Sequence, residues 1–490
     1  MTPARRYLSL GVLTGAVLLL AIDATVLHLA VPSLARDLDA SATAVLWIGD
    51  VYSLAIAGLL ITMGNIADRV GRKRLLLIGA TSFGIASVAA AFAPTPEMLI
   101  VARLLLGVAG STLMPSTLSL IRNIFTDPAE RTRAIAIWSA AAASGIALGP
   151  VVGGALLEHF WWGSVFLINV PVMLIIVGVG AWVLPESKNP HPGRLDLLSS
   201  AWSMLAIVPF VYAIKHLTTG AVDVALAVAL AASAAGSVLF VRRQRRSAAP
   251  MIDIELFRNG SFSGAVAVNF ISVFAMSGVL FFFSQYLQLA RGLQPLGAGL
   301  AQLPVAVASI IAVACVGFLV ARLGRGRAIA FALALGAAGL VAVAVMEGSA
   351  HLSWLLIALV PLGLGIGISE TLSVDAVVSS VPQEKSGAAS SISETAYELG
   401  TAMGIAVLGS VLTVMYRFVL PADAPDAARD SLANAAAELG EGAALEAARE
   451  SFVHSMQVTT LIAAGVMVAG AVVALRLIPN VRPAVAANVD

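Results

Sequence analysis

Charged residues and cysteine are scarce in this chain of 490 residues. Asp, Glu, Lys and Arg together make up 12% of the residues, whereas a soluble domain carries about 25%. Because 59% of the residues are hydrophobic, the chain cannot hide its apolar surface from water, and a soluble globular protein is excluded. Cys315 is the only cysteine, which excludes an internal disulfide and a cysteine-based metal cluster.

The low net charge and the lack of several sequence motifs exclude further classes of function. The formal net charge is only +1, which indicates neither a nucleic-acid partner nor a bulk polyanion. The chain has no Gly-x-x-x-x-Gly-Lys-Ser/Thr phosphate loop and no His-Glu-x-x-His motif, so we predict no cofactor and no metal site. ATP drive would need a separate ATPase subunit, and none is predicted. An integral membrane transferase would need an acid pair or a histidine in a large polar loop. The largest loop, 421–451, has no histidine or aromatic residue, so an enzyme is not expected.

Long apolar runs are what the chain has in abundance, and each is long enough to cross a bilayer as a helix of about 20 residues. Fourteen runs are bounded by Pro, Gly or charge: 8–30, 46–67, 75–93, 97–121, 133–157, 164–184, 196–215, 222–241, 261–289, 297–321, 328–347, 353–380, 386–416 and 455–478. We interpret the first as an uncleaved span, because it is longer than a signal peptide's apolar region and contains Asp23. The fold class predicted is an all-α integral membrane protein.

The distribution of Lys and Arg predicts the orientation. With the N-terminus in the cytoplasm, the cytoplasmic segments hold 22 of these residues and Arg103 lies within a span. The loops expected outside hold six: Arg36, Lys215, Arg291, Arg417, Arg429 and Arg449. This bias follows the positive-inside rule. We therefore predict a multi-pass protein of the inner or plasma membrane with both termini in the cytoplasm.

A glycine- and arginine-rich turn occurs twice, at 64–74 and 317–327, each time between two apolar runs. A membrane protein built from two related halves places its ligand site where they meet, so the repeat favours a transporter over an enzyme. The second copy follows the tenth run, which predicts that the runs 196–215 and 222–241 are an insertion. The domains expected are a six-helix bundle at 1–185, a linker with two inserted helices at 186–258, a six-helix bundle at 259–480 with an acidic outer loop at 417–454, and a cytoplasmic tail at 481–490.

Charged residues inside the runs are functional candidates, because a charge is costly at mid-bilayer. Seven lie away from the ends of the runs: Asp23, Asp50, Arg103, Glu370, Asp375, Glu394 and Glu398. An isolated carboxyl such as Asp23 can take up and release a proton near physiological pH; the alternative is a packing hydrogen bond. Asp50 could share a vestibule with Asp23 or be a hydrated acid near the interface. His28 could relay protons or lie at the interface.

Glu394 and Glu398 are four residues apart, so on a helix they lie on one face about one turn apart. Two carboxylates this close favour a shared proton or a bound cation, and Tyr397 between them could add a cation–π contact. A purely structural pair is the alternative. Glu370 and Asp375 are weaker candidates, because Asp375 lies close to the expected cytoplasmic side.

Small residues recur at four-residue spacing in the fifth run, which also contains a proline. They are Gly145, Gly149, Pro150, Gly153 and Gly154. In lipid this spacing lets two helices pack backbone to backbone, and Pro150 adds a kink. Ordinary close packing is the alternative to a functional role.

With these motifs in view, the chain resembles the major facilitator superfamily, in particular the fourteen-helix drug:proton antiporters and, within them, the quaternary-ammonium multidrug efflux pumps. Residues 64–74 resemble the signature loop of that family, whose conformational latch would comprise Gly64, Asp68, Arg69, Gly71 and Arg72. Ala321 replaces the acid in the second copy. Residues 103–107 resemble the proton-transfer motif, 145–154 the antiporter motif, and 23–32 the first-helix motif, in which His28 replaces the usual Asn.

The resemblance implies a major facilitator fold with two six-helix bundles and two inserted helices. It implies an antiporter that exports lipophilic cations, such as quaternary ammonium compounds, dyes and antiseptics, in exchange for protons by alternating access. The residues implied in proton coupling are Asp23, Arg103, Glu394 and Glu398. Those implied in substrate binding are Asp23, Asp50, Glu394, Glu398 and Tyr397.

One further position departs from the family pattern, and two questions stay open from the sequence. Ser309 stands where the related pumps carry a further acid. Phe281, Phe282 and Phe283 could form an aromatic wall or face lipid. The alternative function is a proton-coupled exporter of an endogenous metabolite or other non-cationic compound. It would need basic groups within the spans, and Arg103 is the one that the sequence offers.

Overall fold

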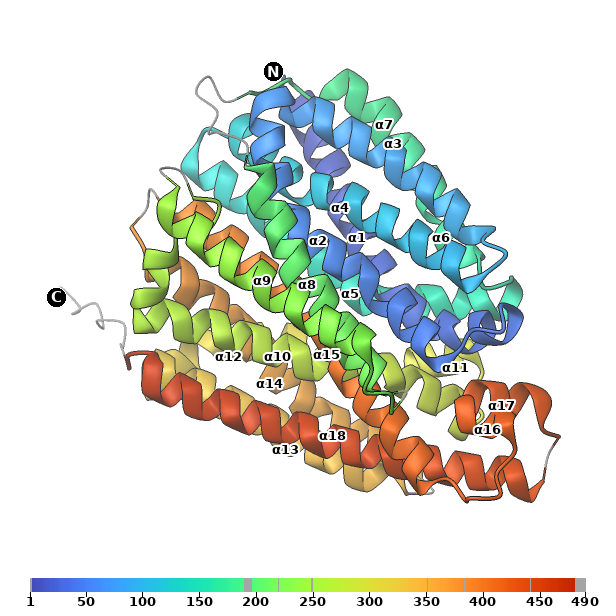
Figure 1. Ribbon diagram of the computed structural model, residues 1–490. Helices are drawn as coiled ribbons and strands as arrows, with labels where there is room; N and C mark the ends of the chain where they lie inside the picture. Colours follow the sequence, from blue (N-terminus) through green and yellow to red (C-terminus); the bar gives the residue numbers. More distant parts are fainter. Residues whose placement is uncertain are drawn as a thin grey trace. The chain divides into compact units, whose positions relative to one another are not determined.

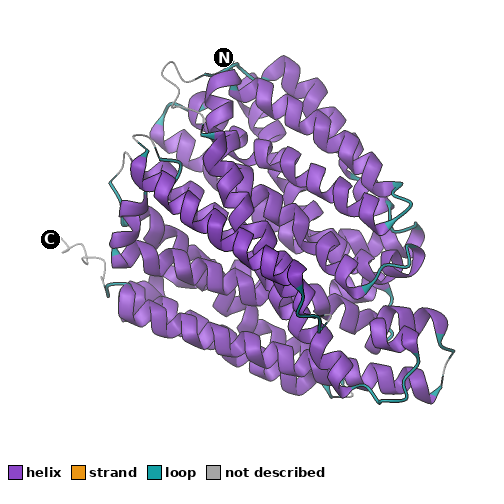
Figure 2. Ribbon diagram, in the orientation of Figure 1, coloured by secondary structure: helices purple, strands orange, loops and turns teal. Residues whose placement is uncertain are grey.

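The computed structural model describes residues 2–188, 196–218, 220–247, 250–349, 351–382, 385–440 and 442–480. Throughout these residues the regular structure is helical (Figure 2). Within this described part of the chain, fourteen helical segments are long and apolar enough to cross a membrane, so the predicted all-α architecture with fourteen candidate spans is confirmed. The predicted tail at 481–490 and the linker residues 189–195 lie outside the described residues.

The helices of the first half of the chain follow the apolar runs closely (Figure 1). They are α1 (Pro3–Asp37), α2 (Ala42–Val70), α3 (Arg72–Ala91), α4 (Pro96–Ile124), α5 (Pro128–His159), α6 (Ser164–Leu167), α7 (Asn169–Val183), α8 (Leu197–Leu217) and α9 (Val224–Arg246). The short α6 and α7 together form one candidate span. Helices α8 and α9 correspond to the two predicted inserted helices.

The remaining helices include several that are interrupted or extended. They are η1 (Ile254–Arg258), α10 (Gly260–Gln285), η2 (Tyr286–Ala290), α11 (Pro295–Leu300), α12 (Leu303–Leu323), α13 (Arg325–Glu347), α14 (Leu352–Ser379), α15 (Ser386–Val419), α16 (Asp426–Asp430), α17 (Leu432–Glu438) and α18 (Ala443–Leu477). The π-helical turn η2 continues α10, and α11 leads into α12, so each pair forms one span. The acidic loop contains α16, α17 and the first turns of α18.

Local sequence signals explain where many helices begin. In α2, α4, α5, α8 and α9 the residue before the first turn accepts a hydrogen bond from a backbone amide of that turn through its side-chain oxygen, which satisfies one of the unpaired amides at a helix start. Gly71 and Gly324 separate α2 from α3 and α12 from α13, with φ values of 118° and 79°. Side chains disfavour these angles, which explains the glycine in both copies of the repeated turn.

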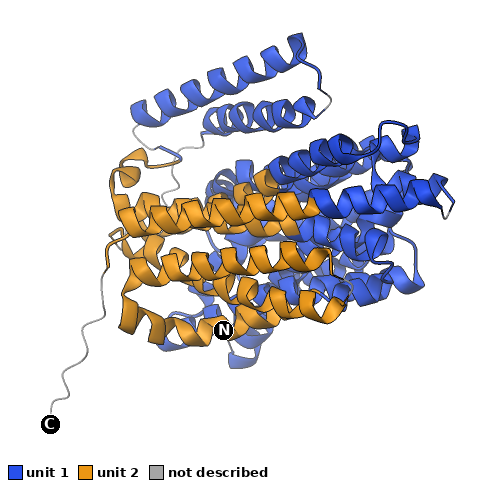
Figure 3. Ribbon diagram, turned by 90° about the horizontal axis from the view of Figure 1, so that it is seen from below, with its two compact units in different colours: residues 1–251, 280–301, 405–455 blue, residues 252–279, 302–404, 456–490 orange. Residues whose placement is uncertain are grey.

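The chain forms two compact units, coloured in Figure 3. Unit 1 comprises residues 1–251, 280–301 and 405–455, and unit 2 comprises 252–279, 302–404 and 456–490. In unit 1, α1 packs on α5, α4 lies between α2 and α3, and α8 packs on α9. In unit 2, α14 packs on both α12 and α13. The domain boundaries predicted from the sequence stay a prediction.

Helices α8 and α9 form a hairpin whose two arms lie side by side (Figure 1). At Gly236 of α9, an added Cβ would lie 2.6 Å from the backbone nitrogen of Ala206, so a side chain there would separate the arms. Arg243 donates a hydrogen bond of 2.8 Å to Asp196, and Gln244 donates one of 2.7 Å to Ser199. These bonds tie the end of α9 to the start of α8.

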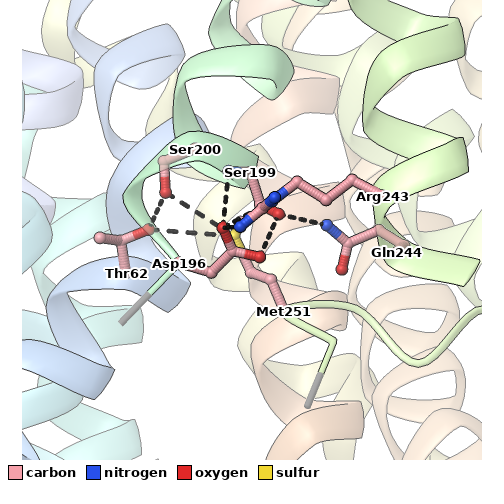
Figure 4. Close-up of polar contacts among 7 residues, drawn as sticks. All are labelled: Thr62, Asp196, Ser199, Ser200, Arg243, Gln244 and Met251. Carbon is pink, nitrogen blue, oxygen red and sulfur yellow. Dashed lines mark hydrogen bonds and ion pairs between the residues drawn. The ribbon is translucent and has the colours of Figure 1, made fainter. Parts of the chain in front are cut away.

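The same end of α8 is attached to α2 by polar contacts (Figure 4). Thr62 of α2 shares a buried hydrogen bond with Ser200, and the Met251 sulfur lies 3.7 Å from the Ser200 hydroxyl. One turn away on α2, a side chain at Gly58 would overlap Met204 of α8. The hairpin is therefore docked on α2 through small and hydroxyl-bearing residues, the packing that helices use in lipid.

Candidate functional site

Asp23 of α1 is fully buried and holds two hydrogen-bond donors. Its Oδ2 lies 3.2 Å from Nη1 of Arg103 on α4. Its Oδ1 accepts a bond of 2.7 Å from the side-chain amide of Asn169 on α7. Asn169 in turn donates to the hydroxyl of Ser87 at 3.1 Å. The sequence singled out Asp23 and Arg103 separately; the expectation that Asp23 is isolated is wrong, because the two form a buried ion pair.

Arg103 is fixed by more than this pair. Its side chain is 1% exposed, its Nε donates to the Ile48 carbonyl at 3.3 Å, and its guanidinium lies 4.5 Å from the centroid of the Tyr52 ring. A guanidinium over an aromatic face is stabilised by the ring quadrupole. Close approach of α4 to α2 depends on Gly107, where a Cβ would lie 2.5 Å from the Tyr52 carbonyl oxygen.

Asp50 of α2 is also buried in an ion pair, which the sequence did not predict. Lys215 of α8 donates a hydrogen bond of 2.8 Å to Oδ1 of Asp50 and lies 2.7 Å from Oδ2. Both side chains are at most 1% exposed. The assignment of Lys215 to an outer loop is wrong, because α8 continues to Leu217 and carries this lysine on its buried face. The alternative of a hydrated Asp50 is excluded by the same burial. Asp23 and Asp50 each have a basic partner of their own, Arg103 and Lys215.

Three further acids gather in unit 2. Glu370 of α14 is close enough to Glu394 of α15 for their charges to interact, and Tyr397 lies within electrostatic range of Glu370, Glu394 and Glu398. Glu398 is buried, whereas the other three side chains are half-buried. The Oε1 atom of Glu370 is buried with no hydrogen-bond partner among the described residues. Glu370 was the weaker candidate from sequence, and the structure brings it to the predicted pair.

Packing around these acids brings α10, α14 and α15 together. Gly400 allows a close approach, because a Cβ there would lie 2.8 Å from the Phe270 carbonyl oxygen on α10. Asn269 of α10 donates to the Ser393 carbonyl at 2.9 Å, beside Glu394. Ser272 of α10 and Ser369 of α14 share a hydrogen bond of 2.8 Å, beside Glu370. The acids therefore lie where α14 and α15 are joined to α10 by hydrogen bonds from hydroxyl and amide side chains.

Two other sequence candidates have structural partners. Asp375 lies 2.9 Å from Arg325 of the second glycine–arginine turn, so α14 supplies the acid that Ala321 does not. Its side chain is 58% exposed, in agreement with its weak rank. Ser309, at the position of the missing acid, donates to the Gly363 carbonyl of α14 at 2.9 Å.

The first copy of the turn is bonded internally. Arg72 donates to Oδ1 of Asp68 from two nitrogens, at 2.8 and 3.0 Å, and to the Ser187 hydroxyl at 3.2 Å. Gly71 leaves room for Glu186, whose Oε1 would lie 2.5 Å from an added Cβ. Arg69 is exposed, and Gly64 makes ordinary contact with α4. The role of this loop as a conformational latch stays a prediction.

The glycines of α5 face two different neighbours. Gly145, Gly149 and Gly153 lie against α1, where added Cβ atoms would crowd its backbone or side chains. At Gly154 a Cβ would lie 2.6 Å from the Pro295 carbonyl oxygen on α11, and Pro150 lies against the same short helix. The motif thus fixes the distance between α5 and the helix that carries Asp23. Its role in antiport stays a prediction.

Aromatic side chains are buried in unit 1. Phe281, Phe282 and Phe283 are at most 4% exposed, so the lipid-facing alternative is wrong for all three. The ring of His28 packs edge-on against Phe281, with 5.2 Å between centroids. A Cβ at Gly49 would lie 2.8 Å from the same phenylalanine ring, so α2 approaches this cluster through a glycine.

Neighbouring groups shift the pKa values of several acids outside the candidate spans. At Asp196, burial alone would raise the pKa, but hydrogen bonds from Arg243 and Ser199 hold it below the ordinary value. A hydrogen bond from Lys385 lowers the pKa of Asp253. In the acidic loop, burial raises the pKa of Asp430, although Arg417 lies 3.7 Å away.

The acids of the two units differ in whether a basic residue neutralises them. In unit 1, each buried acid faces one base, so the pairs Asp23–Arg103 and Asp50–Lys215 are neutral. In unit 2, neither Glu370 nor Glu394 has a basic partner among the residues that the structure describes. Carboxyl groups that are partly shielded from water and lack a basic partner tend to take up a proton or attract a cation. The described residues contain no group of three or more potential metal ligands.

Comparisons with known proteins agree with this architecture. The family model described as Major Facilitator Superfamily matches residues 13–405. The multidrug efflux pump LfrA of Mycolicibacterium smegmatis is 46% identical over 486 residues, covering 96% of each chain. The methyl viologen resistance protein SmvA of Salmonella typhimurium is 37% identical over 469 residues, covering 93% of this chain and 94% of its own.

A solved structure shares the fold. It is the inward-facing, unoccupied form of a bacterial homologue of the human lysosomal transporter Spinster, with a TM-score of 0.68, 17% sequence identity, and coverage of 99% of this chain and 100% of the other. At this identity the likeness concerns the fold alone. The family match over most of the chain and the close relatives carry the assignment: the chain belongs to the major facilitator superfamily of membrane transporters.

Proposed function

We propose that this protein is a proton-coupled multidrug antiporter that exports lipophilic cations in exchange for protons. The names of its relatives support the class of substrate. LfrA, 46% identical, is a multidrug efflux pump, and SmvA confers resistance to methyl viologen, a dication. The chain covers nearly the full length of both relatives, so the whole transport machinery is comparable.

The observation that carries the proposal is the pair of half-buried acids in unit 2, Glu370 and Glu394. Their charges interact, and no described basic residue neutralises them. Two interacting carboxyl groups at a partly buried position repel each other when both are ionised, which favours uptake of a proton or of a cation as counter-charge. A proton and an organic cation therefore compete for the same site, and this competition couples their movements. Glu398 and Tyr397 are close enough to contribute, the tyrosine through its ring face.

Asp23 and Arg103 serve the proton step in this proposal. Protonation of Asp23 would remove the charge that holds Arg103 and release the guanidinium to its remaining contacts, the Ile48 carbonyl and the Tyr52 ring. Because Asn169 bonds the other carboxyl oxygen, Asp23 keeps its orientation in both protonation states. The pair thus provides a two-state element on α1 and α4 whose balance depends on a proton.

The buried charges do not favour a carrier of anions. Arg103 and Lys215 are the bases at issue, and each is neutralised by its own acid. An anionic metabolite would need an unpaired base, whereas the unpaired groups are acids. We propose further that the two six-helix halves rock around a site near mid-membrane, with both termini in the cytoplasm, as the charge bias in the loops favours.

Transport in proteoliposomes tests the proposal. An imposed pH gradient should drive accumulation of benzyltributylammonium, and an uncoupler should abolish it. Glu394→Gln removes one charge-assisted contact, which is worth about 1.5–3 kcal/mol and corresponds to roughly 10- to 100-fold weaker cation binding. Glu158→Gln, at an exposed position on α5, is the matched control and should transport normally. Gradient-driven uptake that is equal in all three proteins would refute the role of Glu394.

A further inference from the structure

The lysine of the inserted hairpin lies in an unusual environment. Lys215 is 1% exposed, and its ammonium nitrogen lies 2.7 and 2.8 Å from the two oxygens of Asp50. The same nitrogen is 3.5 Å from the centroid of the Trp47 ring. Trp47 and Asp50 are three residues apart on α2, so the helix presents the ring and the carboxylate on one face.

A carboxylate and an indole face that converge on one point make a receptor for an ammonium group. The carboxylate supplies the charge, and tryptophan is the strongest of the aromatic rings in cation–π attraction. Organic ammonium ions are recognised by this combination. In this structure the receptor holds an ammonium that belongs to the protein itself.

Helix α8, which carries Lys215, is held by contacts at both of its ends. At its start, Ser200 and Met204 contact α2 at Thr62 and Gly58, as described above (Figure 4). At its other end, Arg417 of α15 donates a hydrogen bond of 3.1 Å to the Thr218 carbonyl. This second anchor lies directly after the helical turn that carries Lys215, far from the contacts at Thr62 and Gly58, so movement of the last turn of α8 could withdraw Lys215 while those contacts stay in place.

We propose that Asp50 and Trp47 form a binding site for organic ammonium ions and that Lys215 is its built-in competitor. A transported cation enters this site only if it binds more tightly than the tethered lysine, so the inserted hairpin sets an affinity threshold. The proposal rests on the proposed export of cations and assigns to the inserted helices a role in specificity. The competing explanation is an ion pair that only stabilises the packing of α8 on α2.

Amine labelling of the wild-type protein separates the two explanations. The chain has four lysines, Lys73, Lys188, Lys215 and Lys385, and Lys215 alone is buried. Reductive methylation followed by mass spectrometry gives the reaction rate of each. Saturating benzyltributylammonium should raise the rate at Lys215 at least tenfold and change the other three less than twofold. An unchanged rate at Lys215, with the probe bound, would overturn the proposal.

Substitution of the lysine provides an independent measurement. Lys215→Met removes the competitor and should lower the dissociation constant of benzyltributylammonium at least tenfold, whereas Lys215→Arg keeps a cation in place and should bind as the wild type does. Adding Asp50→Asn to Lys215→Met should abolish the gain. Adding Trp47→Leu should reduce it about two- to fivefold, as expected for one cation–π contact.

The outcomes distinguish this inference from the proposed function. If Lys215→Met does not fold, the labelling of the wild type decides. If the wild type binds no probe, Lys215→Met must bind it, and failure of both overturns the inference. Wild-type protein that transports the cation while Lys215→Met shows unchanged affinity would refute the competitor and leave the export function intact. If Lys215→Met binds the probe more tightly than the wild type but neither protein transports it, the competitor role of Lys215 stands and the export function is refuted.

Discussion

The contact between α1 and α5 gives a prediction whose size follows from the structure. A Cβ added at Gly145 would lie 2.6 Å from both the Leu18 carbonyl oxygen and the Ala21 Cβ on α1. Ordinary van der Waals contact begins at 3.4 Å, so the two helices would have to separate by about 0.8 Å. Neither atom can rotate away, because one belongs to the backbone and the other is a Cβ. Gly145→Ala therefore displaces α1 itself.

This displacement should affect stability and transport together. Overpacking of this kind costs about 1–3 kcal/mol of unfolding free energy. Asp23 lies on α1 only two residues beyond Ala21 and depends on a 3.2 Å contact with Arg103, so a shift of similar size disturbs the pair. Since misplacement of a functional group by about 1 Å can cost roughly 100-fold in rate, we expect proton-driven uptake of benzyltributylammonium to fall by about tenfold or more.

Thermal unfolding of the purified protein and uptake in proteoliposomes measure the two effects. Gly15→Ala is the matched control, because it lies on α1 and an added Cβ would meet nothing within 4 Å. Its stability should stay the same or rise by up to about 1 kcal/mol, since alanine favours the helix over glycine. If Gly145→Ala is as stable and active as Gly15→Ala, the close packing of α1 on α5 does not control the position of Asp23.

Three further predictions concern individual charges. Arg103→Lys keeps the charge but loses the hydrogen bond to the Ile48 carbonyl, so proton-driven uptake should drop about tenfold, and a normal rate would contradict the role of the guanidinium. Asp253→Asn should cost less than about 1 kcal/mol at pH 7. Because Lys385 lowers the pKa of Asp253, its contribution is present above about pH 4 and is lost as the pH falls through the lowered value, so below this window variant and wild type should unfold alike. The pKa of Asp430 is raised by burial, so the wild type should lose stability as the pH rises from about 4 through the raised value, and Asp430→Asn should lack that part of the slope.

The helices were predictable because the apolar runs are long and their ends carry strong signals. Caps such as Asp127 and Thr95 mark helix starts, and Gly71 and Gly324 interrupt pairs of helices at matching places. Most candidate site residues were also predictable, because a charge inside an apolar run is conspicuous. Asp23, Asp50, Arg103 and the acids of α15 all lie in such runs.

The partners of these residues were not predictable. Asn169 is uncharged, and none of its neighbours in the sequence indicates that it donates the second hydrogen bond to Asp23. Lys215 stands at the end of its run, where a lysine usually reaches water, and only the packing of α8 on α2 shows its burial. Glu370 gained its importance from the register between α14 and α15, which brings it to Glu394. Sequence periodicity within one helix carries no information about register between two.

The coupling of cation and proton at the glutamates of unit 2 is the central claim, and simultaneous recording of both fluxes tests it most directly. Proteoliposomes that hold a pH-sensitive dye are exposed to benzyltributylammonium with the membrane potential clamped. The wild type should move protons in the direction opposite to the cation, and Glu394→Gln should lose both fluxes while Glu158→Gln keeps them. Cation flux in the wild type without any proton movement, or fully coupled fluxes in Glu394→Gln, would contradict the account.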